Sequence, residues 1–248
     1  MEITQLFDSY SLQARVQPAL LALLPPIIAI AAWFPGLYEW GTGLMGLALG
    51  CGAVVFLAHV ARARGRKVQR RLFAVWGGKP SNLWLSHSNQ RLDATTKGRY
   101  HDILASHING WTAPSLEEES KDKQRAQEAY ESAVRWLREK TRDRQRYSLV
   151  FKENVSYGFR RNLYGIKPLG ICLALLSVAG NTWALYFQSW NGTTAATTQG
   201  LASLILNLLF LFSWVAVVRA QWVKDSADAY ARALLAACDQ IGIKNARN

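Results

Sequence analysis

The sequence predicts an all-α integral membrane protein with four transmembrane helices and a basic helical cytoplasmic domain inserted between the second and third helices. Three observations lead to this fold class. The chain has four long apolar windows, it concentrates its positive charge between the second and third of them, and its remaining segments show helical spacing without a convincing strand. Helical and strand periods of 3.6 and 2 residues make this distinction possible.

The four apolar windows cover residues 18–37, 42–60, 168–187 and 200–218. Three of them contain no charged residue, and the second contains only His59. An α-helix rises about 1.5 Å per residue, so about 20 residues cross a hydrocarbon core of about 30 Å. Each window is therefore expected to form one transmembrane helix.

The distribution of charge predicts the orientation. Residues 62–167 hold 23 Lys and Arg against 11 Asp and Glu, a net of +12, which equals the net charge of the whole chain. The two connections between paired windows carry no Lys or Arg. Because Lys and Arg accumulate in cytoplasmic loops, both termini and the middle segment are expected to be cytoplasmic. The predicted divisions are 1–62, the basic domain 63–167, 168–219, and a C-terminal helix 220–248.

Within the basic domain the pattern is helical. Residues 100–108 have helical apolar spacing, and Ser115 with Glu118 matches a capping box at a helix start. A long amphipathic helix is expected at about 121–145, with acids early and cations late, as the helix dipole favours. The tail after residue 219 has similar spacing and is expected to pack on the domain as another helix.

Cations in this domain alternate with aromatic and histidine side chains. Guanidinium groups pair with phosphates and rings stack on bases, so the pattern favours a single-stranded oligonucleotide or a nucleotide. A solvated charged surface is the plain alternative. The residues that we expect to bind such a ligand are Lys97, Arg99, Tyr100, His101, Arg142, Arg144, Tyr157, Arg160 and Arg161.

The apolar windows contain small and polar residues that indicate helix packing or a pore. Gly46 and Gly50 form a GxxxG pair, which lets another backbone approach closely. Asn181 lies late in the third window, and Ser203 and Asn207 lie four residues apart in the fourth. Polar side chains at this depth need a partner or water. They join helices, or they line a pore in a homo-oligomer.

Enzymatic motifs are missing from the sequence. It contains no GxSxG, phosphate-binding loop, GxGxxG or HExxH pattern, so the protein is not expected to be an enzyme or to need a cofactor. His87, His101 and His107 with Asp102 leave a membrane enzyme as a minor alternative, but their spacing predicts no metal site. Cys51, Cys172 and Cys238 suggest no disulfide framework.

Three stretches carry a resemblance to a known group: residues 76–101, 131–143 and 153–170. They resemble the Hailong-type membrane effectors of bacterial anti-phage defence, four-helix proteins paired with a nucleotidyltransferase. The resemblance implies a homo-oligomer in the bacterial inner membrane, with a tetramer as a plausible form. It also implies a cytoplasmic domain that binds a nucleic-acid or nucleotide signal made by the partner nucleotidyltransferase and thereby gates membrane disruption.

Two functions remain open at this point beside the minor enzymatic one. The first is a ligand-controlled, channel-like membrane effector. The second is a membrane-anchored scaffold without a pore, whose basic run at residues 62–71 binds anionic lipid or an acidic partner. Each cation near an anionic leaflet contributes about 1 kcal/mol to the free energy of membrane binding. Because either function would use this attraction, the run alone does not separate them.

Overall fold

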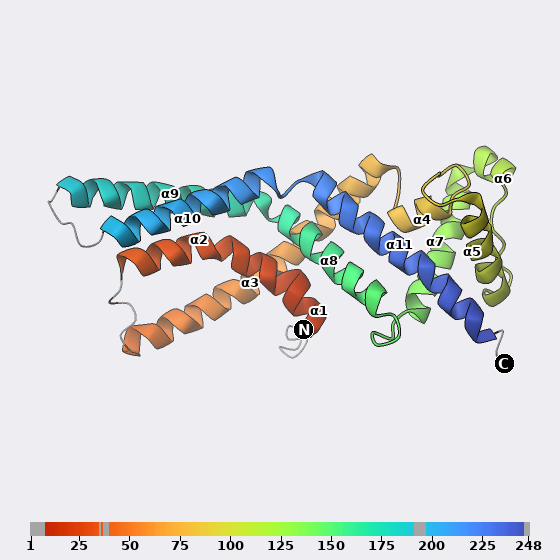
Figure 1. Ribbon diagram of the computed structural model, residues 1–248, viewed down its shortest axis with the longest axis horizontal. Coiled ribbons are helices and arrows are strands. Elements are labelled where there is room, and N and C mark those ends of the chain that lie inside the picture. The colour runs from red at the N-terminus through yellow and green to blue at the C-terminus, as the bar shows by residue number, and fades with distance from the viewer. Residues whose placement is uncertain (1–7, 35, 37–39, 191–196, 246–248) are drawn as a thin grey trace. The chain divides into compact units, whose positions relative to one another are not determined.

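A computed structural model describes residues 8–34, 36, 40–190 and 197–245 (Figure 1). Every regular element in these ranges is helical, which confirms the predicted fold class at the level of secondary structure. The elements in chain order are α1 (Ser9–Ser11), the π-helical η2 (Leu12–Val16), α2 (Gln17–Trp33), α3 (Trp40–Trp76), α4 (Pro80–Leu85), α5 (Ala94–His107), α6 (Leu116–Lys121), α7 (Lys123–Lys140), α8 (Ser148–Gly165), α9 (Lys167–Trp190), α10 (Thr197–Ala216) and α11 (Ala220–Asn245).

The chain divides into two compact units. Unit 1 comprises Met1–Gln69 and Gly158–Val223, and unit 2 comprises Arg70–Tyr157 and Lys224–Asn248. Three helices, α3, α8 and α11, contribute residues to both units. The division differs from the predicted basic domain 63–167 at both ends, because residues 63–69 and 158–167 belong to unit 1.

Unit 1 contains three helices that are long and apolar enough to cross a membrane: Ser9–Trp33, Lys167–Gln188 and Thr198–Ala216. They pack against one another as α2, α9 and α10 (Figure 1). Their outward faces carry exposed apolar side chains such as Leu176, Phe187 and Phe212. A surface this apolar is typical of a lipid-facing or binding surface. Residues 42–60, the predicted second span, lie in α3, but several of their side chains fall outside the described residues, so this span stays a prediction.

Trp33 joins the three packed helices at one end of the bundle. Its indole Nε1–H donates to Oδ1 of Asn181 on α9 over 2.8 Å. A Cβ on Gly200 of α10 would lie only 2.5 Å from the Trp33 ring, so the ring needs glycine at that position. At the opposite end, the Lys167 ammonium donates to the carbonyl of Val218 over 2.7 Å. A cation at these final carbonyls satisfies acceptors that the helix leaves unpaired.

A tight backbone contact in unit 1 joins α3 and α8. A Cβ on Gly165 would lie 2.5 Å from the amide nitrogen of Gly65, a separation that real Cβ atoms do not adopt. A Cβ on Gly65 would in turn collide with the fully buried Asn162. Asn162 donates to the carbonyl of Ala14 over 2.6 Å, which ties α8 to η2. Gly158, one turn earlier, also lies against Ala14.

Unit 2 has its own apolar core. Trp84, Leu104, Tyr130, Leu137 and Leu234, from α4, α5, α7 and α11, are buried together. The predicted capping box of Ser115 and Glu118 is present at the start of α6. The predicted C-terminal helix is α11, and its apolar face belongs to this core, as its spacing indicated. The amphipathic helix expected at about 121–145 is α7, which covers only Lys123–Lys140.

The crossing of α3 and α8 gives the first prediction. We expect Gly165→Val to lower the melting temperature and the yield of monodisperse protein in mild detergent, because overpacking a tight contact costs about 1–3 kcal/mol. The matched control is Gly180→Val on α9, where a Cβ meets nothing within 4 Å. Equal effects of the two substitutions would show that the crossing does not depend on glycine.

Candidate nucleic-acid interface

The most basic short segment of unit 2 is the turn between α7 and α8. We define the basic turn as four exposed cations within seven residues: Lys140, Arg142, Arg144 and Arg146. One acid, Asp143, lies within the same stretch, and a second, Glu139, directly precedes it. The turn therefore keeps a positive excess, and its cations follow the C-terminus of α7, where the helix dipole favours them.

Local hydrogen bonds shape this turn. The Thr141 hydroxyl donates to the carbonyl of Leu137 over 2.9 Å and ends α7. The Asp143 carboxylate accepts from the backbone N–H groups of Gln145 and Arg146 over 2.9 and 3.1 Å. Asp commonly forms such side-chain turns, which set the chain direction between two helices. Tyr147, buried at the start of α8, fixes the end of the turn to the core of unit 2.

Three of the four cations lie over aromatic rings. The Lys140 ammonium is 5.6 Å from the Trp136 ring, and the guanidinium carbons of Arg144 and Arg146 are 4.7 and 5.4 Å from Phe151 and Tyr147. Arg142 instead pairs with Glu139 over 2.7 Å. Ring contacts orient a cation without neutralising it.

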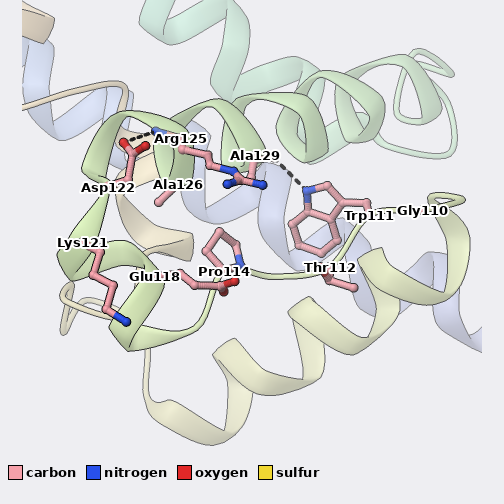
Figure 2. Close-up of a pocket in the computed structure, with 10 residues that line it drawn as sticks. All are labelled: Gly110, Trp111, Thr112, Pro114, Glu118, Lys121, Asp122, Arg125, Ala126 and Ala129. Carbon is pink, nitrogen blue, oxygen red and sulfur yellow. Dashed lines mark hydrogen bonds between the residues drawn. The ribbon is translucent and has the colours of Figure 1, made fainter.

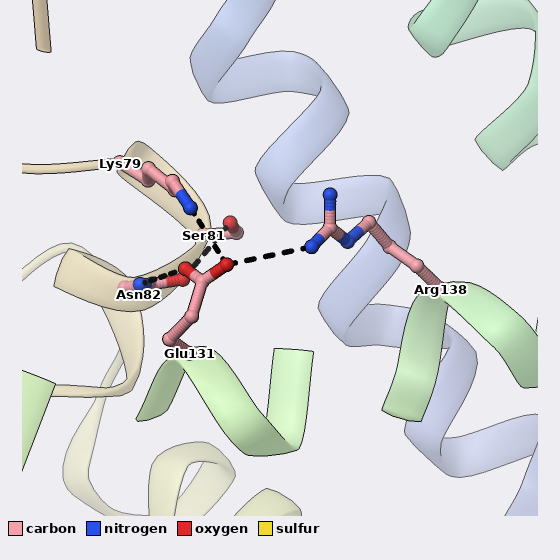
Figure 3. Close-up of polar contacts among 5 residues, drawn as sticks. All are labelled: Lys79, Ser81, Asn82, Glu131 and Arg138. Atoms are coloured by element: carbon pink, nitrogen blue, oxygen red, sulfur yellow. Dashed lines mark hydrogen bonds and ion pairs between the residues drawn. The ribbon is translucent and has the colours of Figure 1, made fainter. Parts of the chain in front are cut away.

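Arg138, one turn earlier, is part of a different group. Figure 3 shows the Glu131 carboxylate between Lys79, Asn82 and Arg138, with distances of 2.6, 2.7 and 3.5 Å. Burial alone would raise the pKa of Glu131, but the hydrogen bonds from Lys79 and Asn82 lower it below its ordinary value. This carboxylate offsets part of the charge of Lys79 and Arg138, which leaves the basic turn as the stronger site for an anion.

The predicted ligand residues on α5 have contacts within the protein. The Arg99 guanidinium meets the Asp239 carboxylate through two hydrogen bonds of 2.8 and 3.2 Å. Tyr100 is buried in the core at 5% exposure, so its ring faces already contact protein. Arg99 remains partly exposed, whereas Tyr100 offers no free face to a base in this structure.

Lys97 and His101 are also buried, at 6% exposure each. The Lys97 ammonium donates to the backbone carbonyls of Ser86 and Asn89, and the His101 Nε2 lies 2.9 Å from the carbonyl of Leu85. Burial lowers the pKa of both side chains. Their hydrogen bonds hold the segment after α4, which gives them a structural role.

The last three predicted residues lie along α8 and fall in different units. Tyr157, in unit 2, is 7% exposed and stacks on Tyr230 of α11 at a centroid distance of 6.4 Å. In unit 1, Arg160 lies over the Trp222 ring at 4.9 Å, and Arg161 donates to Gln69 over 2.6 Å. The nine predicted residues therefore do not form one site, and Arg142 and Arg144 alone belong to the basic turn.

Sequence reasoning missed the most highly connected carboxylate of unit 2, Glu119. It accepts hydrogen bonds from the hydroxyls of Ser86, Ser88 and Tyr130 and from the backbone N–H of His87. Burial alone would raise the pKa of Glu119, but these hydrogen bonds lower it to about 2. Glu119 thus fixes the segment after α4 to α6 and α7. A run of three glutamates gave no signal for which of them would be buried.

A cleft of about 380 Å³ is lined by residues of α6, of α7 and of the segment that precedes α6 (Figure 2). Trp111 forms part of its wall and donates from Nε1 to the carbonyl of Ala129 over 2.9 Å. Lys121 and Arg125 line the cleft together with Glu118 and Asp122. Because the two cations are matched by two acids, the cleft favours a polyanion less than the basic turn does.

The predicted intramembrane residues differ in their contacts. Asn181 is fully buried, accepts from Trp33 and donates to the carbonyl of Ser177, so it joins α2 and α9. Ser203 and Asn207 are buried on α10 without a hydrogen-bond partner among the described residues. A Cβ on Gly46 or Gly50 would meet nothing within 4 Å, so their predicted contact with another helix is not made here.

The histidines of the enzymatic alternative do not converge on a common centre. The rings of His87 and His101 are 5.1 Å apart, whereas His107 lies against Trp136 at 5.9 Å. Within the described ranges no group of three or more His, Cys, Asp or Glu residues is placed to hold a metal ion.

Comparison of the chain with protein-family models, with curated proteins and with solved structures found no match.

The Glu119 network predicts an acid-dependent loss of stability. A carboxylate whose folded pKa is about 2 and whose ordinary value is 4.5 stabilises the fold above pH 4.5, and this contribution is lost as the pH falls toward 2. We expect Glu119→Gln to lower the unfolding free energy at neutral pH by about 3 kcal/mol, because three or more buried donors lose a charged acceptor.

Thermal melting followed by circular dichroism at several pH values checks this. The variant should melt earlier than the natural protein at pH 7, and the difference should shrink in acid. Glu118→Gln, in the exposed capping box, is the matched control and should have a small effect. A difference that does not depend on pH would contradict the assigned role of the Glu119 charge.

Proposed function

We propose that the protein is a ligand-controlled membrane effector whose unit 2 binds a single-stranded nucleic acid or a nucleotide. One observation carries the proposal: α8 begins directly after the basic turn, at Ser148, and ends at Gly165, which contacts Gly65 of α3. The same helix thus connects a candidate anion site with a tight helix crossing in unit 1.

The chemistry of the basic turn favours a phosphodiester or polyphosphate ligand. Guanidinium groups pair with phosphate oxygens through two parallel hydrogen bonds, and three arginines are within five residues. Single-stranded nucleic acids bind to such positively charged surfaces with strong salt dependence. In the absence of ligand the turn leaves like charges close together, so neutralisation by phosphate stabilises a particular arrangement of α7 and α8.

Ligand control requires two states that bind the ligand with different affinity. The proposed states differ in the position of α8, and a shift of α8 changes the contacts of Gly158 and Gly165 with Ala14 and Gly65. Because these glycines lie in tight contact with η2 and α3, we expect a shift of α8 to displace both elements. In this proposal α3 supplies the fourth span at residues 42–60, and both termini and unit 2 are cytoplasmic. The bundle of apolar helices is the part that responds to ligand binding.

The biological setting of the proposal comes from the resemblance of residues 76–101, 131–143 and 153–170 to Hailong-type effectors. It adds a bacterial inner membrane, a homo-oligomer such as a tetramer, a partner nucleotidyltransferase that makes the signal, and membrane disruption during phage infection. Gly46 and Gly50, where a Cβ would meet nothing within 4 Å among the described residues, are candidate positions for contacts between copies.

A second candidate function has its own observation. Arg64, Arg66 and Lys67 are exposed on α3, and the same helix exposes the apolar side chains of Val55 and Phe56 just before them. An apolar face followed by cations is typical of a helix that leaves an anionic leaflet. A scaffold anchored in this way needs neither a pore nor an oligonucleotide.

Binding measurements separate the two functions. We expect Arg142→Ala/Arg144→Ala to weaken binding of a short fluorescent oligonucleotide about tenfold, and to reduce the salt slope by about 1.4, the value for two lost phosphate contacts with a single strand. The control, Lys121→Ala/Lys123→Ala, removes the same charge from another exposed part of unit 2 and should change binding little.

Fluorescence anisotropy of the full chain in mild detergent measures both quantities. Equal weakening by the two double variants would indicate attraction to net charge alone and would contradict the assignment to the basic turn. Binding of anionic vesicles without binding of the oligonucleotide would favour the scaffold.

A further inference from the structure

Two polar side chains inside the apolar bundle have no hydrogen-bond partner in the described part of the chain. Asn207 of α10 is 0% exposed, and neither its Oδ1 nor its Nδ2 is hydrogen-bonded. The Ser203 hydroxyl, 2% exposed, is likewise unpaired. The two residues are four positions apart, so they lie on one face of the helix. Asn181 is equally buried, but both ends of its amide have protein partners.

A dry, unpaired amide is costly at this position. Moving an amide or hydroxyl from water into apolar surroundings without a hydrogen bond costs about 2–7 kcal/mol. More than nine in ten buried backbone polar groups, and most buried side-chain polar atoms, have a partner. An amide and a hydroxyl on the same buried face therefore indicate a group that binds between them.

Helix α2 contributes further acceptors to the bundle. Pro25 and Pro26 have no N–H, so the carbonyls of Leu21 and Ala22 lose their intrahelical donors. Pro25 and Ala22 are buried on the bundle side. Trp33 lies against Gly200, which aligns this end of α2 with the start of α10.

The depth along the two helices can be compared from that alignment. At about 1.5 Å per residue, Ser203 and Asn207 lie roughly 4.5 and 10 Å along α10 from Gly200, and Ala22 lies roughly 16 Å along α2 from Trp33. The carbonyl of Ala22 points toward Pro26, because helical carbonyls point to the C-terminus. Of the two unpaired side chains, Asn207 is therefore the nearer in depth to the two carbonyls, and we call Ser203, Asn207 and these carbonyls the polar layer.

We propose that this polar layer binds water inside the bundle of α2, α9 and α10. The layer offers both donors, on Asn207 Nδ2 and the Ser203 hydroxyl, and acceptors, on the oxygens of the same side chains and the two carbonyls. A cation would leave the amide donor unpaired and an anion would face the oxygens, whereas water donates and accepts. A second copy of the chain cannot reach side chains that are 0–2% exposed.

The inference stands apart from the nucleic-acid proposal, because it uses only the bundle of unit 1. It gives Ser203 and Asn207 a role different from that of Asn181. Asn181 joins helices through protein contacts, while the layer around Asn207 keeps water at a depth where the neighbouring outward residues Leu206 and Leu209 are apolar and exposed.

Water-edited solid-state NMR of the full chain in lipid bilayers tests the proposal. Magnetisation is transferred from water protons to the side-chain amides of isotopically labelled asparagine. The pairs Leu206–Asn207 and Gly180–Asn181 each occur once in the sequence, so both asparagines can be assigned in the unaltered protein by pairwise labelling. No substitution that risks misfolding is needed.

We expect the Asn207 amide to receive water magnetisation severalfold faster than the Asn181 amide, which is the matched control in the same bundle. Transfer to Asn207 as slow as transfer to Asn181 would overturn the proposal. Fast transfer to both amides would also overturn it, because hydration would then not be specific to the polar layer.

Discussion

The contact between Gly65 and Gly165 is the constraint on which the arrangement of unit 1 depends. With no side chain on either residue, the backbones of α3 and α8 come so close that a Cβ on Gly165 would lie 2.5 Å from the Gly65 nitrogen. Asn162 fills the remaining space and binds η2 through the Ala14 carbonyl. Three elements far apart in the sequence therefore meet at one point, and α9 begins directly after it, at Lys167.

Much of this organisation could be predicted because it depends on local patterns. Apolar length indicated the spans of α2, α9 and α10, and Ser115 with Glu118 indicated a helix start. Long-range partners could not be predicted. Nothing local distinguishes Gly165, which contacts another backbone, from Gly50, where an added Cβ would meet nothing within 4 Å. Nothing marks Glu119 as the acid that would accept hydrogen bonds from four residues.

Long-range packing also explains why several predicted ligand residues are buried and not at the surface. Cations beside aromatic residues predicted a binding surface, and at Arg144 the pairing with a ring occurs at the surface. Tyr100 and Tyr157 are buried instead, Tyr100 in the core of unit 2 and Tyr157 against Tyr230. Sequence gives the spacing of charges and rings, but only packing decides which of them face solvent. The helix that follows the basic turn then connects that surface with the Gly65–Gly165 contact.

Ion flux through liposomes that contain the purified protein tests the central claim most directly. A potassium gradient is monitored before and after addition of a short single-stranded oligonucleotide to the side exposing unit 2. The proposal predicts that the oligonucleotide changes the flux, and that Arg142→Ala/Arg144→Ala abolishes the change at the same concentration. An oligonucleotide that binds the natural protein and leaves the flux unchanged would contradict it, because binding would then not reach the bundle.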